Sequence, residues 1–213
     1  MKNTLLFDLD GTLLDTLKDL TISVNYMLKH YDRPLKDEKE IRSFLGNGAF
    51  KLIELAVGEP LNEEALKERF NFYDAHYQTH SLDNTKPYPD ILKLLDIFKS
   101  KGYKMAVISN KQDAIVKDLV QKIFPDTFLA AVGVGKDGVK KPDPRMIEKV
   151  LKEIKATKEE AYLIGDSEVD IQTGQNADVE VIACLWGFRD MKDIAPLKPN
   201  FIVGKPMDII KVI

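Results

Sequence analysis

Cysteine is almost missing from this sequence, because Cys184 is the only one among 213 residues. A single thiol forms no intrachain disulfide and no CxxC metal or redox site. Proteins of a reducing compartment typically lack disulfides, so we expect a cytoplasmic protein in which Cys184 is a small buried strand residue.

Long apolar runs are missing as well. The first apolar run, residues 5–7, is too short for a signal-peptide core or a membrane span and is ended at once by Asp8. The sequence also has no repeat of fixed period and no low-complexity tract. We therefore expect an ordinary globular protein with no membrane partner.

The chain carries no large excess of either charge. Its 31 basic and 34 acidic residues leave a net charge of −3, and no block of like charge is present. Nucleic acid is therefore not an expected partner. The hydrophobic share of 44% can fill a core in a chain of this length.

Short apolar segments, each closed by a polar residue or glycine, indicate buried strands. They are residues 4–7, 104–108, 128–134, 161–164, 179–185 and 201–203. Helical patterns separate most of them; in one, Asp143 fits an N-cap and Pro144 the first helical position. This alternation predicts an α/β fold, a Rossmann-like parallel sheet with helices on both faces and a site at the carboxyl ends of the strands.

The segment 15–83 breaks this alternation. Apolar residues follow helical spacing from Leu17 to Tyr31, and Asn62 fits the capped start of another helix. We interpret 15–83 as a helical domain inserted into a core made of residues 1–14 and 84–213. The alternative is that these helices simply pack on the sheet.

Two aspartates stand at the end of the first predicted strand. Asp8 and Asp10 are two residues apart and are followed by Gly11 and Thr12. Their mutual repulsion at the end of a buried strand requires a proton or a hard divalent cation such as Mg²⁺. The alternative is that both aspartates only form a turn or a cap.

Three further polar segments follow later predicted strands. They are residues 109–111, 138–144 and 165–170. Ser109 offers a hydroxyl at a predicted helix start, where backbone N–H groups favour an anion. Lys141 precedes a rigid helix entry, and Asp166 and Asp170 bring two more carboxylates to the same sheet edge. Taken singly, each has a simpler interpretation as a cap or a solvated side chain.

Together, in this order at four strand ends, these segments resemble the phosphatase branch of the haloacid dehalogenase superfamily. The resemblance implies that Asp8 is the nucleophile that attacks phosphorus and that Asp10 is the general acid and base. Ser109 matches the hydroxyl that binds the phosphoryl oxygens, and Lys141 matches the cation that holds nucleophile and phosphoryl group together. An aspartate at position 10 fits phosphoester hydrolysis better than ATP-driven transport or dehalogenation.

The same resemblance implies a magnesium site. Asp166 matches a Mg²⁺ ligand, which is joined by the carboxylate of Asp8 and the backbone carbonyl of Asp10. Asp170 and Asn110 match supporting positions. A cation there would offset the repulsion between an aspartate nucleophile and a phosphate group.

Other segments are similar to phosphoglycolate phosphatases, and this resemblance covers essentially the whole chain, with a helical cap domain inserted in the core. They are residues 41–49, 73–77, 87–89 and 186–189. One departure is Ala177-Asp178, where relatives usually have Ala-Gly. The loop at Gly46 and Gly48 could close over the site, with Arg42 pairing a substrate carboxylate; alternatively, Arg42 is a solvated helix residue.

We therefore expect a phosphatase that acts on a small phosphorylated metabolite, as a monomer or a homodimer. Two alternatives stay open. One is a related capped enzyme acting on sugar phosphates or pyrophosphate, including a β-phosphoglucomutase-type transferase. The other is a binding or regulatory protein on the same fold, which would not need the complete set of site residues.

Two further patterns are weak. Residues 133–138 spell GxGxxG, but two prolines delay the helix that a dinucleotide site requires. His76 and His80 have zinc-compatible spacing, but the HExxH glutamate is absent and no third ligand is evident. We expect them to be helix-face residues.

Overall fold

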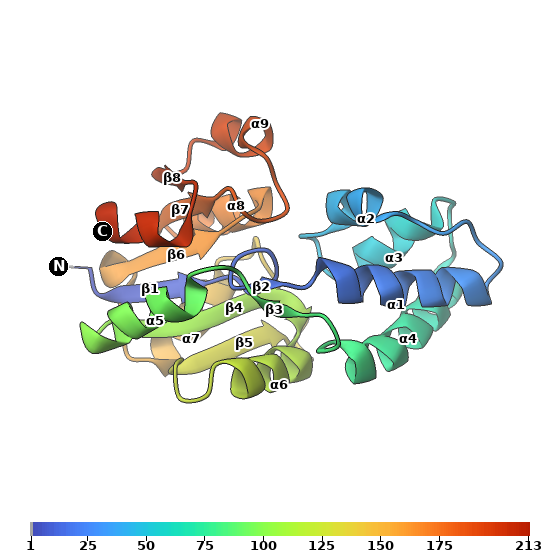
Figure 1. The fold of residues 1–213 in the computed structure, drawn as a ribbon, viewed down its shortest axis with the longest axis horizontal. Coiled ribbons are helices and arrows are strands. Elements are labelled where there is room, and N and C mark those ends of the chain that lie inside the picture. The colour runs from blue at the N-terminus through green and yellow to red at the C-terminus, as the bar shows by residue number, and fades with distance from the viewer. Residues whose placement is uncertain (1) are drawn as a thin grey trace. The chain divides into compact units, whose positions relative to one another are not determined.

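The computed structural model describes residues 2–213, which form two compact units (Figure 1). One unit joins the residues up to Leu14 with Pro87–Ile213, and the other is Asp15–Lys86. Within the described residues no helix combines the length and the apolar composition that crossing a membrane requires.

Six parallel strands form the central sheet of the first unit within the described residues. In sheet order they are β5 (Ala130–Val134), β4 (Lys104–Gln112), β1 (Thr4–Phe7), β6 (Ala161–Gly165), β7 (Glu180–Cys184) and β8 (Phe201–Val203). Because β1 pairs with both β4 and β6, the residues that follow β1 lie in the middle of the carboxyl edge of the sheet. The predicted parallel α/β sheet is confirmed.

Helices connect these strands, as expected for parallel crossovers. They are α5 (Ile91–Ser100), α6 (Asp113–Ile123), α7 (Arg145–Glu153), α8 (Glu168–Asn176) and α9 (Met191–Ile194), with 3₁₀ turns η1 (Lys158–Glu160), η2 (Ala195–Leu197) and η3 (Pro206–Lys211). Figure 1 shows α5 in front of the sheet and α7 behind it. Apolar residues of α7, such as Met146 and Val150, pack with Leu6 and Leu163 in one fully buried cluster. This burial fixes the strands that carry the site.

The second unit is helical. It contains α1 (Leu17–His30), α2 (Glu38–Phe44), α3 (Ala49–Val57) and α4 (Glu63–His80). Asn62 caps α4 as predicted, since its side chain accepts a hydrogen bond from the Ala65 N–H at 2.8 Å. Asp19 of α1 accepts hydrogen bonds from the N–H groups of Asn84 and Thr85, which anchors the segment after α4. The chain passes between the units through β2 (Leu14–Asp15) and β3 (Lys86–Pro87), which pair in a two-stranded sheet.

Two predicted element boundaries are wrong. The N-cap of α7 is Pro144 and not Asp143; the Asp143 carboxylate instead accepts a hydrogen bond from the Arg145 N–H at 3.0 Å. Strand β4 continues to Gln112, which pairs with Val134 after an irregularity in the register. Ser109 therefore lies in an irregular strand end and not at the first turn of a helix, because α6 begins only at Asp113.

The departure at Asp178 has a conformational explanation. Asp178 has a φ of 55°, in the left-handed region that favours glycine, and aspartate is among the residues that tolerate it. Its exposed ion pair with Lys158 contributes little. We expect Asp178→Gly to raise the free energy of unfolding by about 0 to 1 kcal/mol and to leave activity unchanged. Urea unfolding checks this, and a loss of more than about 1 kcal/mol would contradict it.

Candidate active site

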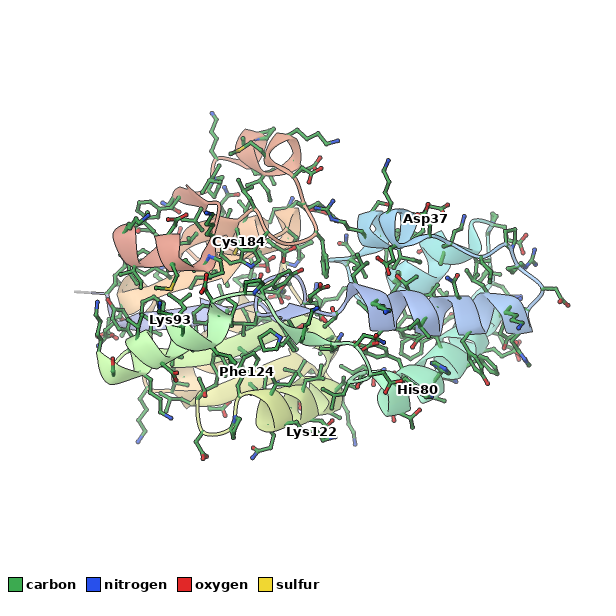
Figure 2. All side chains as sticks on the ribbon, in the orientation of Figure 1. Asp37, His80, Lys93, Lys122, Phe124 and Cys184 are labelled. Carbon is green, nitrogen blue, oxygen red and sulfur yellow. The ribbon has the colours of Figure 1, made fainter. Side chains whose placement is uncertain are left out.

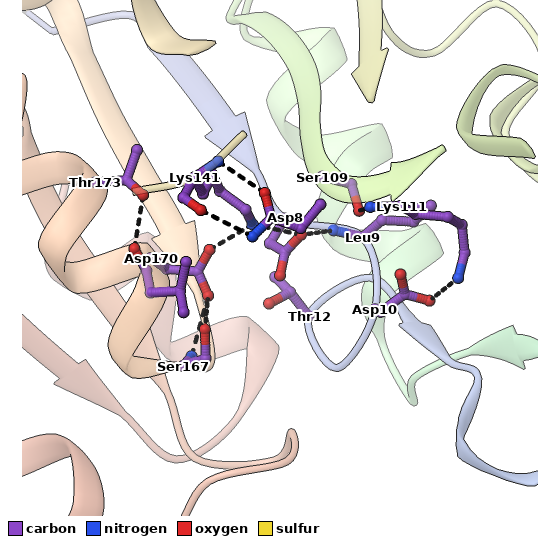
Figure 3. A network of polar contacts seen from close by, with 12 residues as sticks. Asp8, Leu9, Asp10, Thr12, Ser109, Lys111, Lys141, Ser167, Asp170 and Thr173 are labelled. Carbon is purple, nitrogen blue, oxygen red and sulfur yellow. Dashed lines mark hydrogen bonds and ion pairs between the residues drawn. The ribbon is translucent and has the colours of Figure 1, made fainter. Parts of the chain in front are cut away.

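Asp8 directly follows β1 and is almost fully buried. Its Oδ1 accepts a hydrogen bond from the Leu9 N–H at 2.7 Å and pairs with the Nζ of Lys141 at 2.7 Å (Figure 3). Both contacts engage the same carboxylate oxygen. The second oxygen, Oδ2, is therefore the one available to a ligand or a reacting atom.

Lys141 lies between two carboxylates. Its Nζ is 2.7 Å from Asp8 Oδ1 and 2.6 Å from Asp170 Oδ1, and only 2% of its side chain is exposed. Asn110 holds its backbone, accepting from the Lys141 N–H at 2.7 Å and donating to its carbonyl at 3.0 Å. The contacts of Asn110 thus fix the position of the lysine that the sequence placed before a rigid helix entry.

Asp166 follows β6, the neighbour of β1, and is fully buried. The Thr12 hydroxyl donates to its Oδ1 at 3.0 Å, and the Phe188 N–H donates to its Oδ2 at 2.7 Å. The Trp186 indole in turn donates to the Thr12 carbonyl at 3.0 Å. Thr12 and the 186–188 loop were not predicted as site residues, although Thr12 follows the Asp8 and Asp10 pair and residues 186–189 are among the segments similar to phosphoglycolate phosphatases.

Gly187 leaves no room for a side chain beside Asp166. A Cβ there would overlap the Asp166 carboxylate and the Gly11 carbonyl. We expect Gly187→Ala to displace Asp166 and to lower metal affinity and activity by about 10- to 100-fold, as changes to groups that hold metal ligands do. Metal titration of folded protein checks this. Gly204→Ala is the control, because a Cβ there meets nothing within 4 Å. Unchanged affinity in Gly187→Ala would contradict the assignment.

Asp170 lies in the first turn of α8 and is fully buried. Its Oδ2 accepts from the N–H of Ser167 at 3.0 Å and from the Ser167 hydroxyl at 2.7 Å, while its Oδ1 pairs with Lys141. Both oxygens thus engage protein donors. These contacts suit a residue that orients Lys141 and the start of α8.

The structure brings Asp8, Asp166 and Asp170 together. Each offers a carboxylate oxygen, and these oxygens all lie within 4.8 Å of one another. With the ammonium of Lys141 the ionised set carries two net negative charges in a buried place, which is costly without a compensating cation. Oxygen ligands and this charge fit a hard divalent ion. The metal roles of Asp8, Asp166 and the Asp10 carbonyl stay predictions.

The buried charges shift one another's pKa values. Burial, and then the charge of Asp170, raise the pKa of Asp166 to about 7 against the hydrogen bonds from Phe188 and Thr12. The pKa of Asp8 is also raised, first by burial and then by Asp170, with Lys141 acting in the opposite direction. Burial alone would lower the pKa of Lys141, but Asp170 and Asp8 more than offset it, so this pKa is raised. Lys141 therefore stays an ammonium ion.

The raised pKa of Asp166 predicts a pH-dependent response to metal. Its folded-state pKa of about 7 lies above its ordinary value of 3.8. Protonation of Asp166 therefore stabilises the folded chain. This contribution to the free energy of unfolding is fully present below about pH 4 and is lost as pH rises through about 7. A divalent ion requires the deprotonated carboxylate, so we expect saturating Mg²⁺ to raise the unfolding temperature more at pH 8 than at pH 5.5.

Thermal unfolding with Mg²⁺ and with a chelator, at both pH values, checks this expectation. The control is Asp166→Asn, in which the difference between the two pH values should shrink. An equal Mg²⁺ effect at both pH values in the wild-type chain would contradict it.

Asp10 takes part in a different ion pair. Its Oδ1 is 2.9 Å from the Nζ of Lys111, and Figure 3 shows this pair apart from the contacts of Lys141.

Ser109 is buried, and its hydroxyl oxygen accepts a hydrogen bond from the Lys111 backbone N–H at 3.2 Å. The serine proton is then available for donation to a ligand. Lys111 was missed as a site residue, although it is part of the segment that carries Ser109.

The predicted substrate-contacting residues Arg42, Gly46 and Gly48 belong to the helical unit. Arg42 lies in the last turn of α2, and the two glycines have φ values of 109° and 86° in the loop before α3. Such φ values favour glycine and explain why it occurs twice in this loop. Their role in substrate binding stays a prediction.

The weak sequence patterns have structural explanations. The rings of His76 and His80 stack at 4.2 Å on α4, with His76 Nδ1 at 3.0 Å from the Ser23 hydroxyl. His80 Nδ1 is 2.7 Å from the Asp83 carboxylate.

Cys184 is buried at the end of β7 inside the α/β unit, where burial raises the pKa of its thiol (Figure 2). A nucleophilic role is thereby disfavoured.

Asp8, the candidate nucleophile, follows the central strand β1 of the parallel sheet. Asp166 and Asp170 follow the neighbouring strand β6. This arrangement defines a class of hydrolases. The family model described as haloacid dehalogenase-like hydrolase matches residues 5–184, and the chain belongs to this family. The family resemblance predicted from the sequence is thus confirmed, and the chain is an enzyme of the hydrolase class.

The relatives narrow this class. The chain is 31% identical to a phosphoglycolate phosphatase of Aquifex aeolicus, over 98% of this chain and 95% of that one. It is 34% identical to a phosphoglycolate phosphatase of Psychrobacter arcticus, over 93% and 90%. A crystal structure of a predicted phosphoglycolate phosphatase from Haemophilus somnus has a TM-score of 0.89 and 26% identity, covering 99% of this chain and 97% of that one. The chain is therefore a phosphoglycolate phosphatase-like hydrolase.

Proposed function

We propose that this chain is a Mg²⁺-dependent phosphatase that hydrolyses a small phosphate monoester through a phosphorylated Asp8. Phosphoglycolate is the first candidate substrate. The observation that carries the proposal is the buried group of the Asp8, Asp166 and Asp170 carboxylates, two of which, Asp8 and Asp170, pair with Lys141. The names of the relatives supply the candidate substrate.

In the first step, Asp8 Oδ2 attacks phosphorus and the bond between phosphorus and the ester oxygen breaks. Asp10 gives its proton to the departing oxygen, so that an alcohol leaves and not an alkoxide. Lys141 offsets the repulsion between the carboxylate and the phosphoryl oxygens. The Ser109 hydroxyl, whose oxygen accepts a hydrogen bond from the Lys111 backbone N–H, donates a hydrogen bond to one of those oxygens and keeps its proton.

In the second step, water attacks the phosphorus of the aspartyl phosphate. Asp10, now a carboxylate, takes a proton from this water, and the bond between phosphorus and Asp8 breaks. Inorganic phosphate leaves, and Asp8 and Asp10 return to their starting forms. One residue thus serves as acid and then as base.

Asp8, Asp166 and the Asp10 carbonyl would hold Mg²⁺, which supplies positive charge to the phosphoryl oxygens of the transition state. Asp170 supports this set by orienting Lys141 through their 2.6 Å ion pair. In this proposal the helical unit is the cap domain, and Arg42 and the loop at Gly46 and Gly48 contribute to substrate selection.

A panel of phosphate esters with Mg²⁺ tests the proposal. It contains phosphoglycolate, a sugar phosphate, pyrophosphate and ethyl phosphate, and the released phosphate is measured. We expect Mg²⁺-dependent release with the highest kcat/KM on phosphoglycolate. A higher kcat/KM on a sugar phosphate or pyrophosphate would overturn the substrate assignment, and no release from any ester would overturn the phosphatase assignment. Transfer of phosphate back to a sugar would instead indicate a mutase.

A further inference from the structure

A second lysine lies at the same edge of the sheet. Lys111, at the end of β4, pairs with Asp10 at 2.9 Å, and only 8% of its side chain is exposed. The backbone N–H of Lys111 donates a hydrogen bond to the hydroxyl oxygen of Ser109, the residue assigned to bind the phosphoryl group. A lysine is rarely kept this far from water unless it is paired, and Asp10 is its partner here. The reaction proposed above does not use this ammonium group.

The position of Lys111 relates it to the leaving group. Lys141 contacts Asp8 and so lies on the side of the nucleophile. Asp10 has to reach the departing ester oxygen, and Lys111 is held against Asp10. Lys141 therefore pairs with the proposed nucleophile and Lys111 with the proposed acid, and Figure 3 shows the two ion pairs apart from one another.

The chemistry of the leaving group suggests what Lys111 binds. In phosphoglycolate a single CH₂ group separates the ester oxygen from a carboxylate, so the carboxylate lies close to any residue that protonates this oxygen. A lysine ammonium has three N–H donors, so it can donate to an oxygen of the Asp10 carboxyl group, protonated or not, and to a substrate carboxylate together. A leaving group without a charged substituent offers Lys111 no such partner.

The geometry points to Lys111 as the residue that selects esters with a carboxylate next to the ester oxygen. Lys111 binds this substrate carboxylate while it remains in contact with Asp10. The inference rests on the proposed phosphatase function and goes further by assigning selectivity to the core unit. Lys111 is a specificity-determining residue and takes no part in bond making or breaking.

Removal of the ammonium tests this assignment. We expect Lys111→Met to lower kcat/KM for phosphoglycolate by about 10- to 100-fold more than for ethyl phosphate, mainly through KM. Ethyl phosphate is the matched ester because a methyl group replaces the carboxylate. Loss of the contact with Asp10 affects both esters alike, so only the ratio of the two losses reports carboxylate binding.

Two variants accompany Lys111→Met. Lys111→Arg keeps the positive charge and should retain most of the preference for phosphoglycolate. Lys117→Met is the control, because it removes an exposed lysine from an ion pair with Asp113 on the neighbouring helix. It should leave both kcat/KM values unchanged. If Lys111→Met does not fold, Lys111→Gln supplies the same ratio.

Equal losses on the two esters in the Lys111 variants would overturn the inference and leave the proposed function intact. A carboxylate-selective loss in Arg42→Ala without one in Lys111→Met would also overturn it, since the helical unit would then bind the carboxylate. Failure of the wild-type chain to release phosphate from any ester of the panel would contradict the proposed function, and this inference with it.

Discussion

Asp8→Asn should lower kcat by about four to six orders of magnitude, because an amide cannot replace the carboxylate that attacks phosphorus. The fold should persist. Asparagine keeps an oxygen that can accept from the Leu9 N–H, and Lys141 keeps its ion pair with Asp170. The measurements are kcat on the best ester of the panel and the unfolding temperature of each protein.

Asp118→Asn is a matched control for this variant. It removes a carboxylate from an exposed ion pair with Lys122 on α6. Figure 2 shows that the Lys122 side chain points away from the core. Its kcat should equal that of the wild type. If Asp8→Asn kept activity within tenfold of the wild type, Asp8 would not be the nucleophile.

Lys141→Met should be the most destabilising of these substitutions. It leaves the buried carboxylates of Asp8 and Asp170 without their shared ammonium, which costs about 3–5 kcal/mol when one partner of a buried pair is lost. The cost should be smaller at pH 5 than at pH 8, because the already raised pKa of Asp8 rises further and protonation removes its charge. Chemical unfolding without metal at both pH values measures this difference.

Mg²⁺ should restore part of the lost stability of Lys141→Met, since it supplies positive charge to the same carboxylates. It should not restore activity, because the phosphoryl oxygens lose their contact with the ammonium. Lys140→Met, at the exposed neighbouring position, is the control and should unfold like the wild type. Wild-type stability and activity in Lys141→Met would refute the role of this lysine.

The central residues of the site could be predicted because they directly follow strands. Apolar runs located β1 and β6, and the pairing of Phe7 with Ile164 places Asp8 and Asp166 at neighbouring strand ends. Parallel strands bring their carboxyl ends to one edge, so residues far apart in sequence meet there. Lys141 was predictable from its place before Pro142, although only the structure shows that it bridges two carboxylates.

Other parts of the site could not be predicted from residue type. The donor to Asp166 Oδ2 is the backbone N–H of Phe188, which any residue except proline could provide. Gly187 is required there by the space beside Asp166, and this space exists only in the folded chain. The pairing of Lys111 with Asp10 likewise depends on the continuation of β4 past Ile108, where polar residues had suggested the start of a helix.

The most direct test of the proposed chemistry uses Asp10→Asn with p-nitrophenyl phosphate and Mg²⁺. Nitrophenolate leaves without a proton, so the first step proceeds in this variant, whereas the water of the second step lacks its base. We predict a burst of about one nitrophenolate per enzyme molecule, followed by slow turnover, and a phosphoryl group on the peptide that contains Asp8 after acid quenching. Nitrophenolate released steadily, with no burst and no phosphorylated Asp8, would contradict a covalent intermediate on this residue.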